Sequence, residues 1–94
     1  MIFTVIGLLK QPVPPRDAAF EAALSAHLAQ PNLRIVNAGY LRDARREPIG
    51  ILALIETDSF ARAQAFLECS PFQTGGYFER TEVAEYDAEV GRTS

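Results

Sequence analysis

The sequence has few of the residues on which several classes of protein depend. Its 94 residues include one cysteine, Cys69, and one histidine, His27. A single cysteine excludes an internal disulfide and is typical of a reducing compartment. One histidine and one cysteine, without the spacing of metal ligands, argue against a metal site. We therefore expect no metal ligand set, and no motif in the chain indicates a cofactor.

Long apolar runs and an excess of positive charge are also missing. The apolar run from Met1 to Leu9 is too short to span a bilayer, and it lacks the basic start of a signal peptide. The net charge of −3 gives no general attraction to nucleic acid, whose binders need a basic face. With 48% apolar and 22% charged residues, the composition is typical of a globular domain. We expect a cytoplasmic protein with neither a nucleic-acid nor a membrane partner.

The periodicity of apolar residues predicts six elements in the order βαββαβ. The expected strands are residues 1–9, 33–42, 49–56 and 77–86, and the expected helices are residues 16–30 and 57–69. This order is the ferredoxin-like arrangement, an α+β fold with a four-stranded antiparallel sheet and two helices on one face. We expect one domain over residues 1–87 and a flexible tail over residues 88–94.

Both predicted helices carry a cap and an apolar side. Asp17 is a candidate N-cap of the first helix, and either Asp58 or Ser59 caps the second. Pro31 and Pro71 are expected to end them. The residues expected on the inner sides are Phe20, Ala23, Leu24, His27 and Leu28 in the first helix and Phe60, Ala63, Phe66 and Leu67 in the second.

The sheet order of this topology, 4-1-3-2, predicts a second copy of the chain as a partner. The first and third strands are central in that order, and both are apolar on their two faces. Two helices cover one face only, which leaves an exposed apolar patch of roughly several hundred Å². Covering it at about 25 cal/mol per Å² supplies several kcal/mol. We expect a homodimer through this sheet face, as in a dimeric α/β barrel.

Four stretches in this order resemble the YciI-like (YCII-related) family of small dimeric α/β barrel proteins. They are "AHLA" at residues 26–29, "NAGYLRD" at 37–43, "GILALIETDSFARAQAFL" at 50–67 and "SPFQTGGYFERTEV" at 70–83. The resemblance covers residues 1–86 and implies a small-molecule pocket with a histidine and an aspartate as an acid–base pair. His27 matches the histidine. Ser70 stands where the family has the aspartate, directly before Pro71 and Phe72.

His27 and Ser70 are accordingly the candidate catalytic residues, and each has a structural alternative. An unperturbed histidine titrates at about 6.5 and can exchange a proton near neutral pH. Alternatively, the ring packs on the helix stripe with one nitrogen bonded to a backbone carbonyl. Ser70 would orient the imidazole without adding charge, or it would cap a turn beside Pro71.

Tyr40, Arg42, Phe72 and Tyr77 are the candidate substrate-binding residues. The tyrosines either line a cavity or only pack. Arg42, Arg45 and Arg46 form a basic cluster that either holds an anion at the pocket mouth or is a solvated loop. Cys69 is expected to be a small buried residue rather than a nucleophile, and residues 75–76 a glycine turn rather than a phosphate site.

Three functions remain open from the sequence. The first is a cofactor-independent lyase or isomerase that uses His27 for proton transfer on a small anionic or aromatic substrate. The second is a protein that binds such a molecule without turnover, as the serine at position 70 favours. The third is a dimeric interaction protein that has no pocket. A cavity beside His27 would separate the first two functions from the third.

Overall fold

The computed structural model describes residues 1–31 and 33–91 and confirms the predicted βαββαβ order. The elements are β1 (Ile2–Leu9), α1 (Ala18–Leu28), β2 (Arg34–Arg42), β3 (Pro48–Glu56), α2 (Phe60–Glu68), α3 (Pro71–Thr74) and β4 (Phe78–Glu85). The short helix α3 is an addition to the prediction, which placed only the end of a helix at Pro71. The predicted tail over residues 88–94 lies partly outside the described residues.

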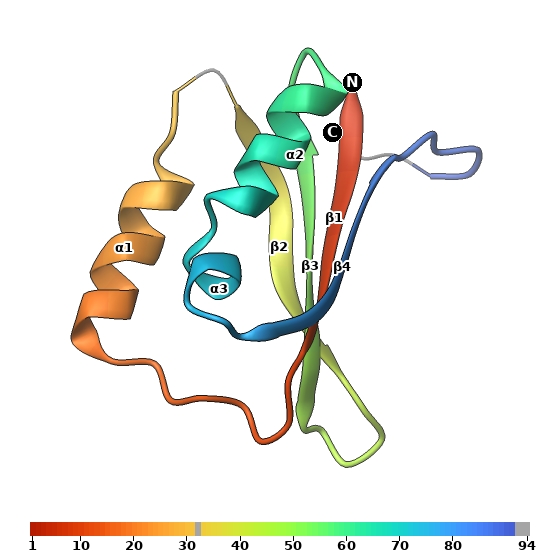
Figure 1. Ribbon diagram of the computed structural model, residues 1–94. Coiled ribbons are helices and arrows are strands. Elements are labelled where there is room, and N and C mark those ends of the chain that lie inside the picture. Colours follow the sequence, from red (N-terminus) through yellow and green to blue (C-terminus); the bar gives the residue numbers. More distant parts are fainter. Residues whose placement is uncertain (32, 92–94) are drawn as a thin grey trace.

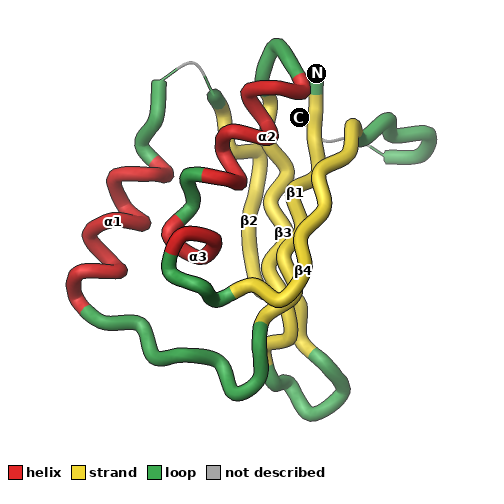
Figure 2. Tube along the Cα trace, in the orientation of Figure 1, coloured by secondary structure: helices red, strands yellow, loops and turns green. Residues whose placement is uncertain are grey.

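The sheet is antiparallel throughout, with the strand order β2-β3-β1-β4, as predicted for a ferredoxin-like α+β fold. The two strands that are apolar on both faces, β1 and β3, therefore lie in the centre. All three helices lie on the same side of the sheet, with α1 farthest from it (Figure 1). The tube in Figure 2 shows the long connection from β1 that carries the chain out to α1.

Polar side chains cap each helix at its N-terminus. Asp17 accepts a hydrogen bond from the Phe20 amide at 2.8 Å, which confirms it as the cap of α1. Of the two candidates for α2, Ser59 is the cap, because its side chain accepts from the Arg62 amide. Asp58 instead forms an ion pair with Arg62 at 3.0 Å.

Alternate residues of β1 show which face of the sheet the helices cover. Phe3, Val5, Gly7 and Leu9 are buried, whereas the residues between them are only half-buried. Phe3 and Val5 pack with β3 and with the inner side of α2, where Ala63, Phe66 and Leu67 are buried. Phe60 belongs to the predicted inner side but is 49% exposed, and only its ring edge contacts Phe3. Phe60 is the first residue of α2, one turn before the first buried residue of that helix, Ala63.

Helix α1 buries much less of its apolar side than its sequence predicts. His27 is its one buried residue, Phe20 and Leu24 are half-buried, and Leu28 is 44% exposed. Ala23 is also exposed. The expectation that the whole stripe packs on the sheet is therefore wrong. Helix α1 meets α3 and, through His27, Phe66 of α2. A cavity separates it from the strands.

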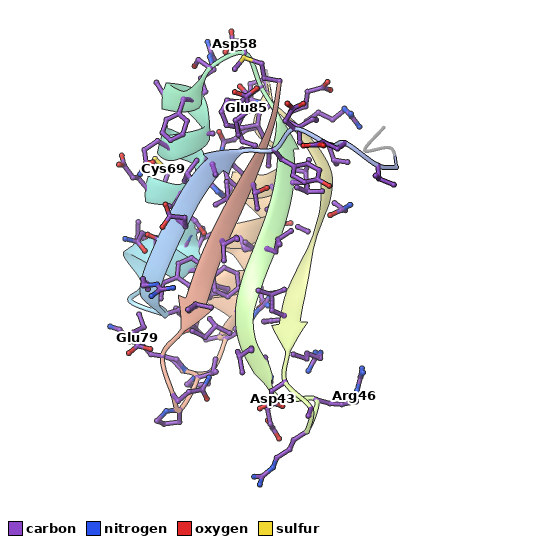
Figure 3. All side chains as sticks on the ribbon, turned by 90° about the vertical axis from the view of Figure 1, so that its right-hand side faces the viewer. Asp43, Arg46, Asp58, Cys69, Glu79 and Glu85 are labelled. Atoms are coloured by element: carbon purple, nitrogen blue, oxygen red, sulfur yellow. The ribbon has the colours of Figure 1, made fainter. Side chains whose placement is uncertain are left out.

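The other face of the sheet has no helix over it among the described residues. Figure 3 looks onto this face, with β4, β1, β3 and β2 in front of the helices. The half-buried residues of β1 point to it together with Leu52 and Leu54 of β3, and the register places Ile6 opposite Leu52 and Thr4 opposite Leu54. Within the described chain no helix is both long and apolar enough to cross a membrane.

Candidate functional site

A cavity of about 220 Å³ lies between α1 and the helix-covered face of the sheet. Each of the seven elements contributes a described residue to it, as do the loops that hold Arg16 and Ser70. Four of these lining residues carry polar side chains: Arg16, His27, Tyr40 and Ser70. The remainder are apolar, aromatic or glycine residues: Val5, Gly7, Leu24, Leu28, Ala38, Gly39, Ile51, Ala53, Phe66, Leu67, Phe72 and Phe78. Ala38 and Ala53 lie on the floor of the cavity, and their small side chains leave this space.

His27 reaches the cavity from the last turn of α1. Its side chain is 9% exposed, and its ring packs on Phe66 of α2 with 4.4 Å between the ring centroids and 31° between the planes. Burial lowers the pKa of His27 below its ordinary value of 6.5, because the charged form is poorly solvated there. The backbone of Phe66 has a smaller, opposite effect. His27 is therefore a neutral imidazole at neutral pH.

The two ring nitrogens of His27 have different surroundings. Nδ1 lies 2.9 Å from the side-chain Nε2 of Gln30, which also donates to the His27 carbonyl at 3.0 Å. Nε2 of the imidazole is buried and has no hydrogen-bond partner among the described residues. The structural alternative for His27 predicted a bond to a backbone carbonyl. The Phe66 backbone, whose hydrogen bond raises the pKa of the ring, is the group in the structure that fits this alternative. The contact between Nδ1 and the Gln30 side chain is an addition to it.

Ser70 lies at the cavity wall, between α2 and α3. It is 8% exposed, and its Oγ accepts a hydrogen bond from the Phe72 amide at 3.3 Å. This bond makes Ser70 the N-cap of α3, which is the capping role expected beside Pro71. His27 and Ser70 thus line one cavity, while the hydrogen bond that Ser70 accepts serves the local backbone.

Arg16, which the sequence analysis did not single out, lies at the rim of the cavity. Its guanidinium pairs with both carboxylate oxygens of Glu21 and donates to the Tyr40 hydroxyl at 2.6 Å. The hydrogen bond to Glu21 is the main reason that the pKa of Arg16 is raised above its usual range, and the same bond lowers the pKa of Glu21. The signal available in the sequence was an arginine directly before the helix cap Asp17.

The four predicted substrate-binding residues are placed in different ways. Tyr40 and Phe72 line the cavity. Tyr77 is buried behind Phe72, with 5.5 Å between the ring centroids, and its hydroxyl donates to the Pro15 carbonyl at 2.6 Å. Arg42 lies over the Tyr40 ring and donates to the Arg46 carbonyl at 2.8 Å. Neither Tyr77 nor Arg42 is among the described lining residues of the cavity.

The remaining candidate residues lie away from the cavity. Asp43 and Arg46 are at the tip of the β2–β3 hairpin, at the end of the sheet opposite Asp58 (Figure 3). The prediction that Cys69 is buried is wrong: it is exposed, because it follows the last turn of α2 as its C-cap. The glycine turn at residues 75–76 is confirmed, with φ of +77° at Gly76. No metal-binding group of side chains occurs among the residues that the structure describes.

Neither the known family models nor the curated proteins give a match to this sequence. Among solved structures, the chain is similar to 5-chloro-2-hydroxyhydroquinone dehydrochlorinase (TftG) from Burkholderia phenoliruptrix AC1100, solved in complex with 2,5-dihydroxybenzoquinone. The TM-score is 0.68 at 20% sequence identity, and the match covers 93% of this chain and 94% of that chain. The two chains share one fold.

Proposed function

We propose that this protein binds one small aromatic molecule with an oxygen substituent in the cavity beneath α1. The observation that carries the proposal is a cavity of about 220 Å³ whose wall is mostly apolar but includes His27, a buried histidine with an unpartnered nitrogen. An apolar cavity of about 150 Å³ is large enough to bind benzene in another protein. The space beneath α1 therefore suits a single substituted ring. A pocket of this kind argues against a purely structural interaction protein.

The charges around the cavity favour an aromatic ligand over a strongly anionic one. Arg16 is the basic residue at the rim, and the carboxylate of Glu21 already pairs with it. An anionic ligand would have to displace that carboxylate. Tyr40 and Phe72, which line the cavity, supply aromatic contacts of the kind that a bound ring uses. Of the two ligand classes expected from the sequence, the aromatic class is therefore the one we propose.

Direct titration tests this proposal. We expect acetophenone, a single ring with one carbonyl, to bind with a measurable Kd by calorimetry. The variant Ala38→Phe should abolish this binding, because a large side chain at that position fills the floor of the cavity. Ala44→Phe, in the exposed β2–β3 turn, is the matched control and should bind as the unmodified protein does. Equal binding by all three proteins would place the ligand elsewhere and end the proposal.

A second candidate function is cofactor-independent elimination or isomerisation on such a ring, as in a YciI-like enzyme. The supporting observations are the neutral, buried imidazole of His27 and the fold shared with a dehydrochlorinase. His27 would transfer the proton, and Ser70 stands where the family has its aspartate. Conversion of a ring substrate should be lost in His27→Gln and gained or increased in Ser70→Asp. Turnover that is unaffected by His27→Gln would exclude this function.

The alternative to catalysis is binding without turnover. The hydrogen bond from the Phe72 amide to Ser70 Oγ supports it, because it commits the serine to capping α3. This alternative predicts saturable binding of the ring and no product in the unmodified protein. Product formation by the unmodified protein would exclude it.

We also propose that two copies of the chain pack through the helix-free face of the sheet. Ile2, Ile6, Leu52 and Leu54 point to this face and are only half-buried in a single chain. A second copy would present the same apolar residues, and packing the two faces together would bury the apolar residues of both chains. The cavity is on the opposite face, so the two proposals rest on different surfaces of the sheet.

A further inference from the structure

The side chain of Gln30 makes two hydrogen bonds that together fix its orientation. Its Nε2 lies 3.0 Å from the His27 carbonyl oxygen and 2.9 Å from His27 Nδ1. A backbone carbonyl only accepts hydrogen bonds, so the amide atom that faces it has to be the nitrogen. The two hydrogens of that nitrogen are then shared between the carbonyl and Nδ1.

This arrangement determines which nitrogen of His27 carries the proton. Nδ1 accepts from Gln30 and therefore has no hydrogen when the ring is neutral. The proton of the neutral imidazole is on Nε2, which is buried and makes no hydrogen bond of normal geometry to a described residue. The Phe66 backbone is near enough to raise the pKa of the ring, so it is the competing acceptor within the protein. A buried donor without a partner costs free energy, and an acceptor on a ligand would recover it.

We propose that Gln30 is a positioning residue that holds His27 as an Nε2–H donor, and that the ligand of the cavity presents a carbonyl or quinone oxygen to this hydrogen. The inference rests on the proposed function and goes further by naming the group on the ring that is recognised. It also assigns His27 a different role from that of a base. In this tautomer Nε2 polarises a carbonyl group and cannot accept a proton from carbon.

The tautomer is measurable without any ligand. His27 is the only histidine in the sequence, so a two-bond ¹H–¹⁵N correlation spectrum of the labelled protein contains one imidazole. Above the pKa of the ring we expect Nε2 to be the protonated nitrogen. In Gln30→Glu the carboxylate can only accept, and we expect the proton to move to Nδ1. Gln64→Glu on α2 is the matched control and should leave the spectrum of His27 unchanged.

Two results would overturn the role given to Gln30. One is a neutral ring protonated on Nδ1 in the unmodified protein. The other is an unchanged tautomer in Gln30→Glu. It would mean that other groups around the ring, and not the glutamine, determine which nitrogen carries the proton. A glutamine that serves only to cap the end of α1 would give this second result.

The class of ligand is tested with a matched pair of rings, acetophenone and ethylbenzene. The ratio of their Kd values in one protein measures how much the carbonyl group contributes to binding. At a pH above the pKa of the ring in both proteins, we expect this preference for acetophenone to fall roughly tenfold in Gln30→Glu, where Nε2 has lost its hydrogen. Equal ratios in the two proteins would show that the carbonyl of the ligand does not accept a hydrogen bond from Nε2. That result would overturn the ligand assignment. If neither ring binds, the proposed function fails and the ligand assignment with it, while the spectrum still decides the role of Gln30.

Discussion

Arg16 and Tyr40 are joined by a hydrogen bond of 2.6 Å from the guanidinium to the phenol oxygen, although 24 residues separate them in the sequence. Arg16 precedes α1 and Tyr40 belongs to β2, so this bond joins the segment before α1 to an edge strand of the sheet. The guanidinium also lies over the rings of Phe20 and Phe72, at 5.2 and 5.4 Å from their centroids. Both bonded residues line the cavity, so the bond closes part of its rim.

Tyr40→Phe removes this bond and keeps the ring. We expect acetophenone to leave the cavity several-fold faster, because α1 is no longer held to β2 at the rim. The free energy of unfolding should change by about 1 kcal/mol or less, since the Arg16 side chain is 30% exposed and Tyr40 is 38% exposed. Stopped-flow dissociation and urea unfolding measure the two quantities.

Tyr86→Phe is the control for loss of a phenol at an exposed position. Tyr86 is 41% exposed, close to the 38% of Tyr40, and it lies after β4 and away from the cavity. Acetophenone should dissociate from Tyr86→Phe at the same rate as from the unmodified protein. Identical rates in the two variants would show that the bond between Arg16 and Tyr40 does not restrict access.

The burial of His27 makes the stability of the fold depend on pH. Because burial lowers the pKa of His27 below 6.5, the unfolded chain binds a proton that the folded chain binds less well. The free energy of unfolding is therefore highest above the ordinary pKa and falls as the pH falls through the window below 6.5. Arg16, the charged residue that shares the cavity, stays protonated throughout this window.

His27→Phe keeps an aromatic ring against Phe66 and removes the titrating group. We expect the variant to lose less stability than the unmodified protein between about pH 7.5 and about pH 5.5, as measured by urea unfolding at each pH. The lowered pKa of Glu21 affects both proteins equally and acts in a more acidic range. An equal loss in both proteins would show that the ring is solvated enough to titrate normally.

The sequence predicted the sheet well because strand and helix periodicities leave few alternatives. The two strands without a polar face, residues 2–9 and 48–56, could only be central. The cap Asp17 was recognisable as a polar residue before an apolar repeat, whereas the sequence left Asp58 and Ser59 as alternatives for the second helix. Helix α3 was missed, because a four-residue turn after Pro71 has no periodicity to detect.

The site was predicted less completely, because it depends on distances between elements. His27, Ser70, Tyr40 and Phe72 were selected by their types and by the family resemblance, and all four line the cavity. Arg16 and Gln30 were missed, since each acts through a side-chain contact rather than a motif. The apolar stripe of α1 predicted close packing, whereas the small residues below it on the sheet leave a cavity. No helical repeat contains that information.

Gly7 leaves room for a ring that forms part of the cavity wall. A Cβ added at this position would overlap the side chain of Phe78, which also lines the cavity. We expect Gly7→Ala to lower the free energy of unfolding by about 1–3 kcal/mol, because a well-packed ring must move. The double variant Gly7→Ala with Phe78→Leu should recover part of this loss in urea unfolding.

Gly39→Ala is the matched control, since Gly39 is also within a strand and a Cβ there would meet no atom within 4 Å. Its free energy of unfolding should change by no more than about 1 kcal/mol. If both alanine variants are equally stable, the ring of Phe78 moves without cost and Gly7 has no packing role.

Ile6 tests the proposed dimer, because it lies in the middle of the helix-free face. Its cross-strand partners are Leu52 on β3 and Glu82 on β4. In Ile6→Lys the new charge can pair with Glu82 within one chain, while two copies would bring their lysines together. We expect the unmodified protein to sediment as a dimer at micromolar concentration and Ile6→Lys to sediment as a monomer.

The monomeric variant should still bind acetophenone, because the cavity lies on the other face of the sheet. Ala61→Lys, on the exposed side of α2, is the control and should remain dimeric. A single-chain mass for the unmodified protein would end the dimer proposal and leave the cavity intact. A loss of binding that accompanies dissociation would instead show that the second copy holds the sheet, and with it the cavity floor at Ala38 and Ala53, in shape.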